Sequence, residues 1–169
     1  MAIRISCYYR LHDVDLLTAA LLHDAVEDHP AALADGRPGD ATEAALGTLA
    51  REFGQRAADL VRSVTNPRYE PDRDRDLQYR EHIASSLARN PWARPIKFSD
   101  FTDNATGVVY SQGPRVRRWA AKYRPLVPIL KGVLALPDTP LDDQARRHVL
   151  GQLELAEERL APILDTPVS

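Results

Sequence analysis

The stretch Ala19-Ala20-Leu21-Leu22-His23-Asp24-Ala25-Val26-Glu27-Asp28 indicates a helix that carries chemistry. Apolar residues run directly into four ionisable side chains, spaced i,i+3 and i,i+4: His23, Asp24, Glu27 and Asp28. This spacing places all four on one side of a helix. We expect that helix over about residues 14–27, with Asp13 as its N-cap and with Leu17 and Leu21 anchoring it in a core.

The charge of this stretch needs an explanation, because three carboxylates beside one imidazole repel one another unless a cation lies among them. One interpretation is a divalent metal held by His23 and Asp24, with Glu27 and Asp28 acting on a metal-bound water. The other is a solvated acidic helix end with a core-facing histidine. The ten residues alone leave both interpretations open.

Length and composition restrict the class of protein. A chain of 169 residues with 44% apolar and 27% charged residues suits one globular, soluble domain. The net charge of -2 favours neither nucleic acid nor an anionic membrane as a partner. Cys7 is the single cysteine, which excludes an internal disulfide and fits a reducing compartment. No apolar run approaches the length of a membrane span, and residues 1–4 lack the pattern of a signal peptide, so we expect a cytoplasmic protein.

The rest of the chain shows helical periodicity, and no window alternates with period two, so we expect an all-α protein. Further helices are expected at about 3–11, 42–53 (capped by Thr42), 57–64, 77–89, 91–104, 116–136 and 141–164. Loops are expected at 31–41 and 66–76, and breaks at Gly113-Pro114 and near Pro125 and Pro128.

A second informative stretch is Ile96-Lys97-Phe98-Ser99-Asp100-Phe101-Thr102-Asp103-Asn104. Lys97 and Asp100 are i,i+3, and Asp100 and Asn104 are i,i+4, so Asp100 and Asn104 share a helix face and could both point into a site. The alternative is a surface Lys–Asp pair beside a solvated asparagine, because such pairs are common and weak.

Together the two stretches resemble the HD-domain metal-dependent phosphohydrolases. The resemblance is closest to the branch with the (p)ppGpp hydrolase domain of Rel/SpoT enzymes and their small single-domain relatives. Residues 53–65 (FGQRAADLVRSVT) resemble that branch's helix and Val-Thr segment, and residues 96–100 resemble its Lys-Leu-Ala-Asp motif. Asn104 falls where the branch has a nucleotide-contacting asparagine. The blocks agree in order and spacing over about residues 10–130, which implies an HD-domain helical bundle, with residues 1–169 as a single domain.

This resemblance also implies an activity and a ligand set. The family metal, Mn²⁺ or another divalent ion, would be held here by His23, Asp24 and Asp100. Glu27 and Asp28 match the acidic pair that orients or activates the attacking water. The resulting hydroxide attacks a phosphorus atom, while the cation stabilises charge on the phosphate. The leading expected activity is hydrolysis of the 3'-pyrophosphate of guanosine 3',5'-bis(diphosphate), with Asn104 contacting the nucleotide.

Departures from the family pattern keep alternatives open. The family's first metal-binding histidine and its helix would lie ahead of Met1, so either the natural protein begins further upstream or the metal site is incomplete. Phe101 stands where the family usually has arginine, and Gly107 where the branch has threonine. A phosphomonoesterase for ordinary nucleotides, or an inactive HD fold that binds a nucleotide or a protein, therefore stays open.

Lys97 and a basic segment late in the chain remain to be assigned. We expect Lys97 to support its own helix. A late basic segment resembles a helix of the small homologues and either reaches phosphates or forms a solvated face; its residues are Arg117, Arg118, Lys122, Tyr123 and Arg124. We expect no nucleic-acid or membrane partner, and the sequence leaves a homo-oligomer open.

Overall fold

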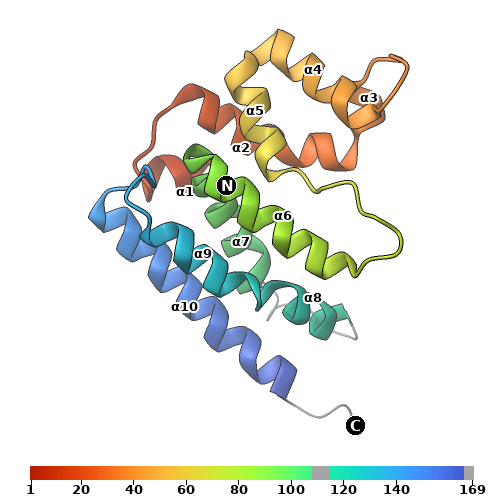
Figure 1. Cartoon of the computed structure of the whole chain (residues 1–169). Coiled ribbons are helices and arrows are strands. Elements are labelled where there is room, and N and C mark those ends of the chain that lie inside the picture. The colour runs from red at the N-terminus through yellow and green to blue at the C-terminus, as the bar shows by residue number, and fades with distance from the viewer. Residues whose placement is uncertain (108–114, 166–169) are drawn as a thin grey trace.

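The computed structural model describes residues 1–107 and 115–165, and over these ranges it contains helices and no strand (Figure 1). The expectation of an all-α protein is confirmed. The helices are α1 (Ala2–Cys7), α2 (Val14–Asp28), α3 (Pro30–Leu33), α4 (Ala41–Phe53), α5 (Gln55–Val64), α6 (Arg75–Arg89), η1 (Pro91–Ala93), α7 (Arg94–Gly107), α8 (Arg115–Tyr123), α9 (Leu126–Ala135) and α10 (Asp143–Asp165).

Aspartates cap the N-termini of α2 and α4. Asp13 accepts a hydrogen bond from the backbone N–H of Leu16 at 2.9 Å, so the expected N-cap of α2 is confirmed. Asp40 accepts from the N–H groups of Thr42 and Glu43 at 2.9 and 3.2 Å. Asp40, and not Thr42, therefore caps α4, and its carboxylate also meets the positive end of the helix dipole.

The connections differ in part from the expected ones. The expected loop at 31–41 overlaps α3, which begins at Pro30, where the fixed φ of proline suits the first helical position. Gly54 separates α4 from α5 with a φ of 95°, as favours glycine.

The expected break near Pro125 is confirmed, because α8 ends at Tyr123 and α9 begins at Leu126. Pro128 makes no second break, because it lies in the first turn of α9, where its missing N–H costs no helical hydrogen bond. The expected break at Gly113-Pro114 lies outside the described residues.

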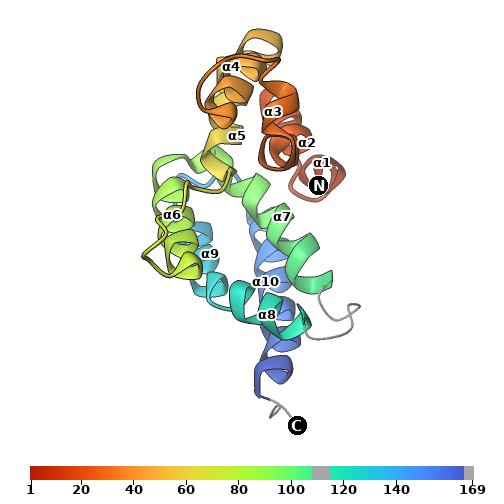
Figure 2. The ribbon, with the colours of Figure 1, turned by 90° about the vertical axis from the view of Figure 1, so that its right-hand side faces the viewer.

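The helices form two groups with α7 between them. Helices α1–α5 lie together at one end, and α6 and α8–α10 lie at the other (Figures 1 and 2). Helix α7 contacts α1 and α2 on one side and α8, α9 and α10 on the other. One hydrophobic cluster runs through both groups, from Ile5 to Leu160. The two sequence stretches with ionisable residues therefore meet where α2 crosses α7.

Two arginines fix the position of α7. Arg94 at its start is fully buried, and its Nη1 lies 2.6 Å from Asp138 Oδ1. Arg4 of α1 donates from Nη1 to the carbonyl oxygen of Ser99 at 2.9 Å and from Nη2 to Asp103 Oδ1 at 2.6 Å. The start and the middle of α7 are thereby tied to other parts of the fold by charge-assisted hydrogen bonds.

Helix α2 buries a face that differs from the expected one. Its buried residues are Leu16, Ala19, Ala20, His23 and Val26, at the spacing of one helix face. Leu21 is 70% exposed, so its expected role as a core anchor is wrong, while Leu17 packs partly against the core. The small alanines on the buried face allow neighbouring helices to approach closely, and His23 is the polar residue among them.

The length and apolarity of the described helices can be compared with those of a membrane span. Among residues 1–107 and 115–165, no helix combines the length and apolarity that a bilayer crossing demands.

Candidate functional site

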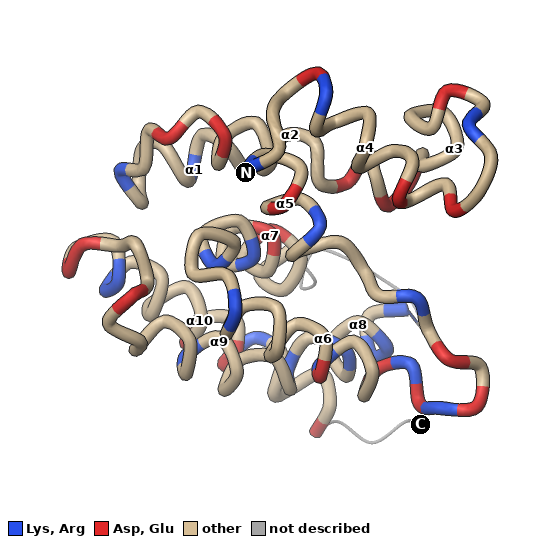
Figure 3. Tube along the Cα trace, turned by 45° about the horizontal axis from the view of Figure 1, so that its top comes forward, with Lys and Arg blue, Asp and Glu red and all other residues tan. Residues whose placement is uncertain are grey.

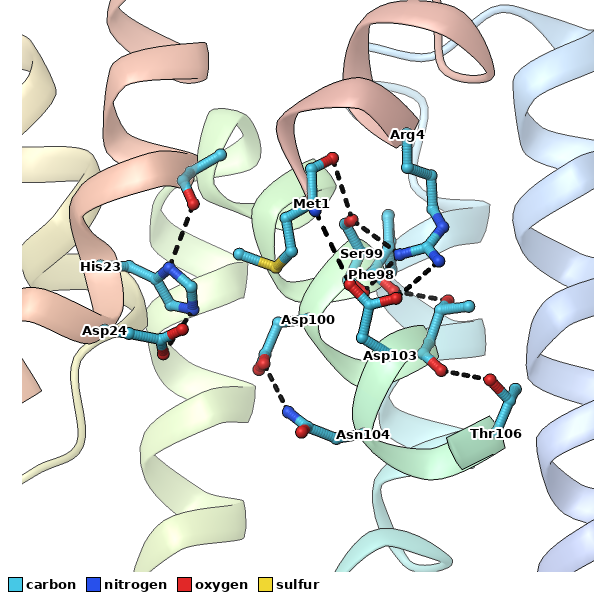
Figure 4. A network of polar contacts seen from close by, with 12 residues as sticks. Met1, Arg4, His23, Asp24, Phe98, Ser99, Asp100, Asp103, Asn104 and Thr106 are labelled. Carbon is cyan, nitrogen blue, oxygen red and sulfur yellow. Dashed lines mark hydrogen bonds and ion pairs between the residues drawn. The ribbon is translucent and has the colours of Figure 1, made fainter. Parts of the chain in front are cut away.

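A small pocket of about 80 Å³ lies where α2 meets α7, and we call it the α2–α7 pocket. It is lined by His23, Asp24, Glu27, Asn66, Tyr79, Lys97, Asp100, Asn104, Lys122 and Tyr123. Five of the six residues that the sequence singled out thus line one pocket, and Figure 4 shows how four of them face one another. The sixth, Asp28, is exposed and does not line it.

His23 presents one ring nitrogen as a ligand. Its side chain is 6% exposed, and Nδ1 lies 3.2 Å from the carbonyl oxygen of Ala20. A carbonyl oxygen only accepts, so we assign the ring proton to Nδ1, which leaves Nε2 with its lone pair free. Nε2 makes no hydrogen bond to the described part of the chain, although Asp24 Oδ1 lies 2.8 Å away (Figure 4). With Nε2 unprotonated, both atoms are acceptors at this distance, and either a proton or a metal ion between them removes the repulsion.

Asp24 lies close to other acidic side chains. Burial raises the pKa of the Asp24 carboxyl, the neighbouring Asp100 and Asp28 raise it further, and His23 opposes this rise only when its ring is protonated and positively charged. The Asp24 side chain is nonetheless 70% exposed, so an ion from solvent can reach it. This environment favours a bound cation beside Asp24.

Asp100 belongs to a hydrogen-bond network on α7 that runs from the buried Lys97 to the exposed Asn104. Lys97 Nζ donates to Asp100 Oδ2 at 2.6 Å, and Asn104 Nδ2 donates to Asp100 Oδ1 at 2.6 Å. Lys97 is 5% exposed, so the alternative of a surface Lys–Asp pair is wrong. Burial alone would lower the pKa of Lys97, but the charge of Asp100 and the contact with Tyr79 outweigh it, and the pKa is raised. Lys97 is therefore a charged ammonium in the wall of the pocket.

The donor set fits a divalent ion in part. Two neighbouring ligands of an octahedral ion, each about 2.1 Å from it, lie about 3 Å apart, close to the separation of His23 Nε2 and Asp24 Oδ1. Asp100 is engaged by Lys97 and Asn104 and does not join this pair. Over residues 1–107 and 115–165, no three side chains of His, Cys, Asp or Glu form a group that could hold a metal ion. His23 and Asp24 are thus a ready pair, and Asp100 has to turn to become a third ligand.

Glu27 is held by a residue that the sequence did not single out. The backbone N–H of Asn66 donates to Glu27 Oε1 at 2.9 Å, and its side-chain Nδ2 donates to Oε2 at 2.5 Å. Burial raises the pKa of Glu27, and the hydrogen bond from Asn66 opposes this shift. A carboxylate with a raised pKa in a pocket is suited to accept a proton.

A wider pocket of about 290 Å³ adjoins the first, and we call it the α6–α8 pocket. It is lined by Asn66, Tyr69, Arg75, Asp76, Tyr79, Arg118, Trp119, Lys122 and Tyr123, and the basic residues of α8 are visible in Figure 3. The Tyr79 ring lies within cation–π reach of two ammonium groups, at 5.4 Å from Lys97 Nζ and 4.6 Å from Lys122 Nζ. Burial and the charge of Lys97 lower the pKa of Lys122, and burial raises the pKa of Tyr123 to about 12.

The sequence pointed to some of the pocket residues and not to others. Lys122 and Tyr123 were open between a phosphate-contacting and a solvated role, and both line the two pockets. Asn66 and Tyr79 were missed, because no spacing within one helix links either residue to the two stretches, and each reaches the site only through the fold. The Thr-Asn-Pro sequence at 65–67 was the available signal for Asn66, since a residue before proline is biased to an extended backbone.

A larger pocket of about 390 Å³ lies on the other side of Asn66, between α4, α5 and α6. Its charged side chains pair with each other: Arg62 contacts Glu43, and Arg68 lies 3.7 Å from Asp40. Because these charges are already paired, few remain to bind a ligand. The α2–α7 pocket is therefore the better candidate for a functional site, although it is smaller.

Comparison of the chain with protein-family models, with curated proteins and with solved structures finds no match. We therefore base the function on the residues of the α2–α7 and α6–α8 pockets.

Proposed function

We propose that this chain is a divalent-metal-dependent phosphohydrolase of the HD type, acting on a nucleotide in the α2–α7 pocket. The observation that carries the proposal is the free Nε2 of His23, 2.8 Å from Asp24 Oδ1 and in the same pocket as Glu27. We propose Mn²⁺ as the metal and guanosine 3',5'-bis(diphosphate) as the leading substrate, from the resemblance of the two sequence stretches.

His23 and Asp24 would hold the metal, and Asp100 would join them after its carboxylate turns from Lys97. When bound, a divalent cation supplies Lewis acidity toward water and toward a phosphate. The rise in the pKa of Asp24, caused by burial and by the neighbouring Asp100 and Asp28, supports this assignment, because a cation relieves the repulsion.

Glu27 would act as the general base. Burial is the largest cause of the raised pKa of Glu27. A pKa closer to neutral pH makes the carboxylate a more efficient proton acceptor. Lys97 keeps its charge near the phosphate and balances the carboxylates of the site. Asp28, which is exposed, would contribute through its charge on Asp24.

The α6–α8 pocket supports a substrate that has a second anionic group. Arg75, Arg118 and Lys122 supply positive charge, and Trp119 with the tyrosines supplies apolar ring surface. A nucleotide with phosphates at two positions has both features, whereas a simple phosphomonoester leaves this pocket unfilled. Asn104 Nδ2 donates to Asp100, so its amide oxygen remains for the nucleotide.

A second candidate is an HD-fold protein that binds a nucleotide without hydrolysing it. The observation in its favour is that both oxygens of Asp100 already accept hydrogen bonds, from Lys97 and from Asn104. In this case Lys97 takes the place of the metal as the counter-charge of Asp100.

Three measurements separate these functions. The chain is incubated with Mn²⁺ and guanosine 3',5'-bis(diphosphate), and pyrophosphate release is measured for wild type, Asp24→Asn and His12→Ala as an exposed-histidine control. The proposal expects release by wild type and the control and none by Asp24→Asn. Release of inorganic phosphate from nucleoside monophosphates alone would indicate the phosphomonoesterase. Nucleotide binding without turnover would indicate the inactive HD fold.

A further inference from the structure

We infer that Asn66 is the positioning residue for the Glu27 carboxylate, and that Tyr69 supports the orientation of the Asn66 amide. The value of this arrangement for catalysis rests on the proposed function, whereas the contacts themselves do not. Neither residue belongs to the two sequence stretches that carry the resemblance.

The local sequence explains why Asn66 faces α2. Helix α5 ends at Val64, its C-cap Thr65 has an extended backbone (φ -66°, ψ 141°), and Pro67 keeps Asn66 out of the helical region. The carbonyl oxygen of Thr65 lies 3.0 Å from His82 Nε2 of α6, and this contact ties the turn to α6. The N–H and the side chain of Asn66 are thereby both free to turn toward Glu27.

Asn66 donates one hydrogen bond to each oxygen of the Glu27 carboxylate. Its backbone N–H lies 2.9 Å from Oε1 and its Nδ2 lies 2.5 Å from Oε2, so the plane of the Glu27 carboxylate is fixed. Hydrogen bonds to a carboxylate favour its charged form, which counters the burial of Glu27. Each oxygen keeps a lone pair for the pocket, because a carboxylate accepts about four hydrogen bonds.

Tyr69 supports the direction in which the amide of Asn66 points. Its hydroxyl donates to Asn66 Oδ1 at 3.4 Å, a long contact that agrees with the NH₂ group, and not the oxygen, facing Glu27. The Tyr69 ring in turn lies 4.4 Å from the Arg75 guanidinium carbon. Because Tyr69 and Arg75 line the α6–α8 pocket, a contact path runs from that pocket to Glu27.

The contacts can be tested without activity, by ¹⁵N–¹H NMR of the full chain. Glu27→Ala is expected to shift the backbone amide and the side-chain NH₂ signals of Asn66 and to speed exchange of that backbone amide. Tyr69→Phe is expected to move the side-chain signal more than the backbone signal. Asn90, whose Nδ2 donates to Ser63 Oγ at 3.0 Å, provides the reference signal that stays in place. Unchanged Asn66 signals in Glu27→Ala would overturn the inference, whether or not the protein is active.

The positioning role is tested by steady-state kinetics of Asn66→Ala, Asn66→Asp and the control Asn90→Ala. Loss of a residue that orients a catalytic group typically costs about 10–100-fold, so we expect kcat of Asn66→Ala to fall by this amount with KM unchanged. Asn66→Asp should be worse than Asn66→Ala, because a second carboxylate repels Glu27. A wild-type kcat for Asn66→Ala, in an enzyme whose wild type turns over, would overturn the role, and a wild type without turnover would instead count against the proposed function.

Discussion

His23 Nε2 lies 2.8 Å from Asp24 Oδ1, and no hydrogen bond joins the two atoms. With the ring proton on Nδ1 toward Ala20, both atoms are acceptors, and their closeness is unfavourable unless a cation lies between them. The surrounding acidic residues add to this requirement. This pair is the reason that the α2–α7 pocket, although small, is the centre of the proposed function.

Glu27 and Asp28 should differ in importance. Glu27→Gln is expected to lower kcat by about 10²-fold or more, because it removes the general base. Asp28→Asn is expected to lower it by less than about tenfold, since Asp28 is exposed and acts only through charge. Steady-state kinetics on proteins with wild-type circular dichroism would check this. Equal losses in both variants would mean that the two residues act as the pair that the sequence predicts.

Lys97 should matter for stability before it matters for chemistry. Lys97→Met is expected to lower the free energy of unfolding by about 3 kcal/mol, because it leaves the largely buried Asp100 side chain, 15% exposed, without its charge partner. The double variant Lys97→Met/Asp100→Asn should cost less than the single one, since no unpaired charge remains. Urea unfolding at pH 7 measures both.

Lys131→Met is the matched control for that experiment. Lys131 pairs with Glu157 at 2.7 Å on the surface, and loss of an exposed pair costs about 0–1 kcal/mol. If Lys97→Met were no more destabilised than Lys131→Met, the burial of the Lys97–Asp100 pair would be wrong.

His82 should make stability depend on pH. Burial lowers the pKa of His82 below its ordinary value of 6.5, so the unfolded chain binds this proton more readily than the folded one. The free energy of unfolding should therefore fall as the pH drops from above 6.5 toward the lowered pKa. In His82→Gln, which keeps a donor for the Thr65 carbonyl, the decrease should be smaller. Parallel pH profiles in urea would count against this assignment.

Lys122 should affect substrate affinity more than turnover. Lys122→Met removes one cation from the α6–α8 pocket, and loss of a hydrogen bond to a charged group corresponds to a KM rise of about tenfold or more. We expect kcat to change little, and the difference between variant and wild type to shrink at high salt. A fall in kcat at unchanged KM would place Lys122 at the reacting phosphate instead.

Much of this site follows from spacing within single helices. The i,i+3 and i,i+4 relations place His23, Asp24 and Glu27 on one side of α2, and Asp100 and Asn104 on one side of α7, and the contact of the two helices joins these sides in one pocket without Asp28. Such relations depend only on helix geometry, which local sequence determines well. The helical fold class followed from the same periodicity.

Features that depend on packing between helices did not follow. Lys97 lies beside Tyr79 of α6 and shares its pocket with Lys122 and Tyr123 of α8. The sequence spacing predicts the Lys97–Asp100 pair, but it does not predict that residues of other helices pack around it. The Asn66–Glu27 contact joins residues 39 positions apart, and the exposure of Leu21 depends on which face α2 turns inward. In each case the missing information was the arrangement of neighbouring helices.

The most direct measurement is the Mn²⁺ content of the 169-residue chain after equilibration with Mn²⁺ and removal of free metal. The variants are His23→Ala and Asp24→Asn, with His12→Ala as the control. The proposed site predicts about one Mn²⁺ per chain in wild type and in the control, and a large loss in both site variants. Absence of bound Mn²⁺ in wild type, or equal binding by His23→Ala, would contradict the metal site and leave Lys97 as the resident cation of the α2–α7 pocket.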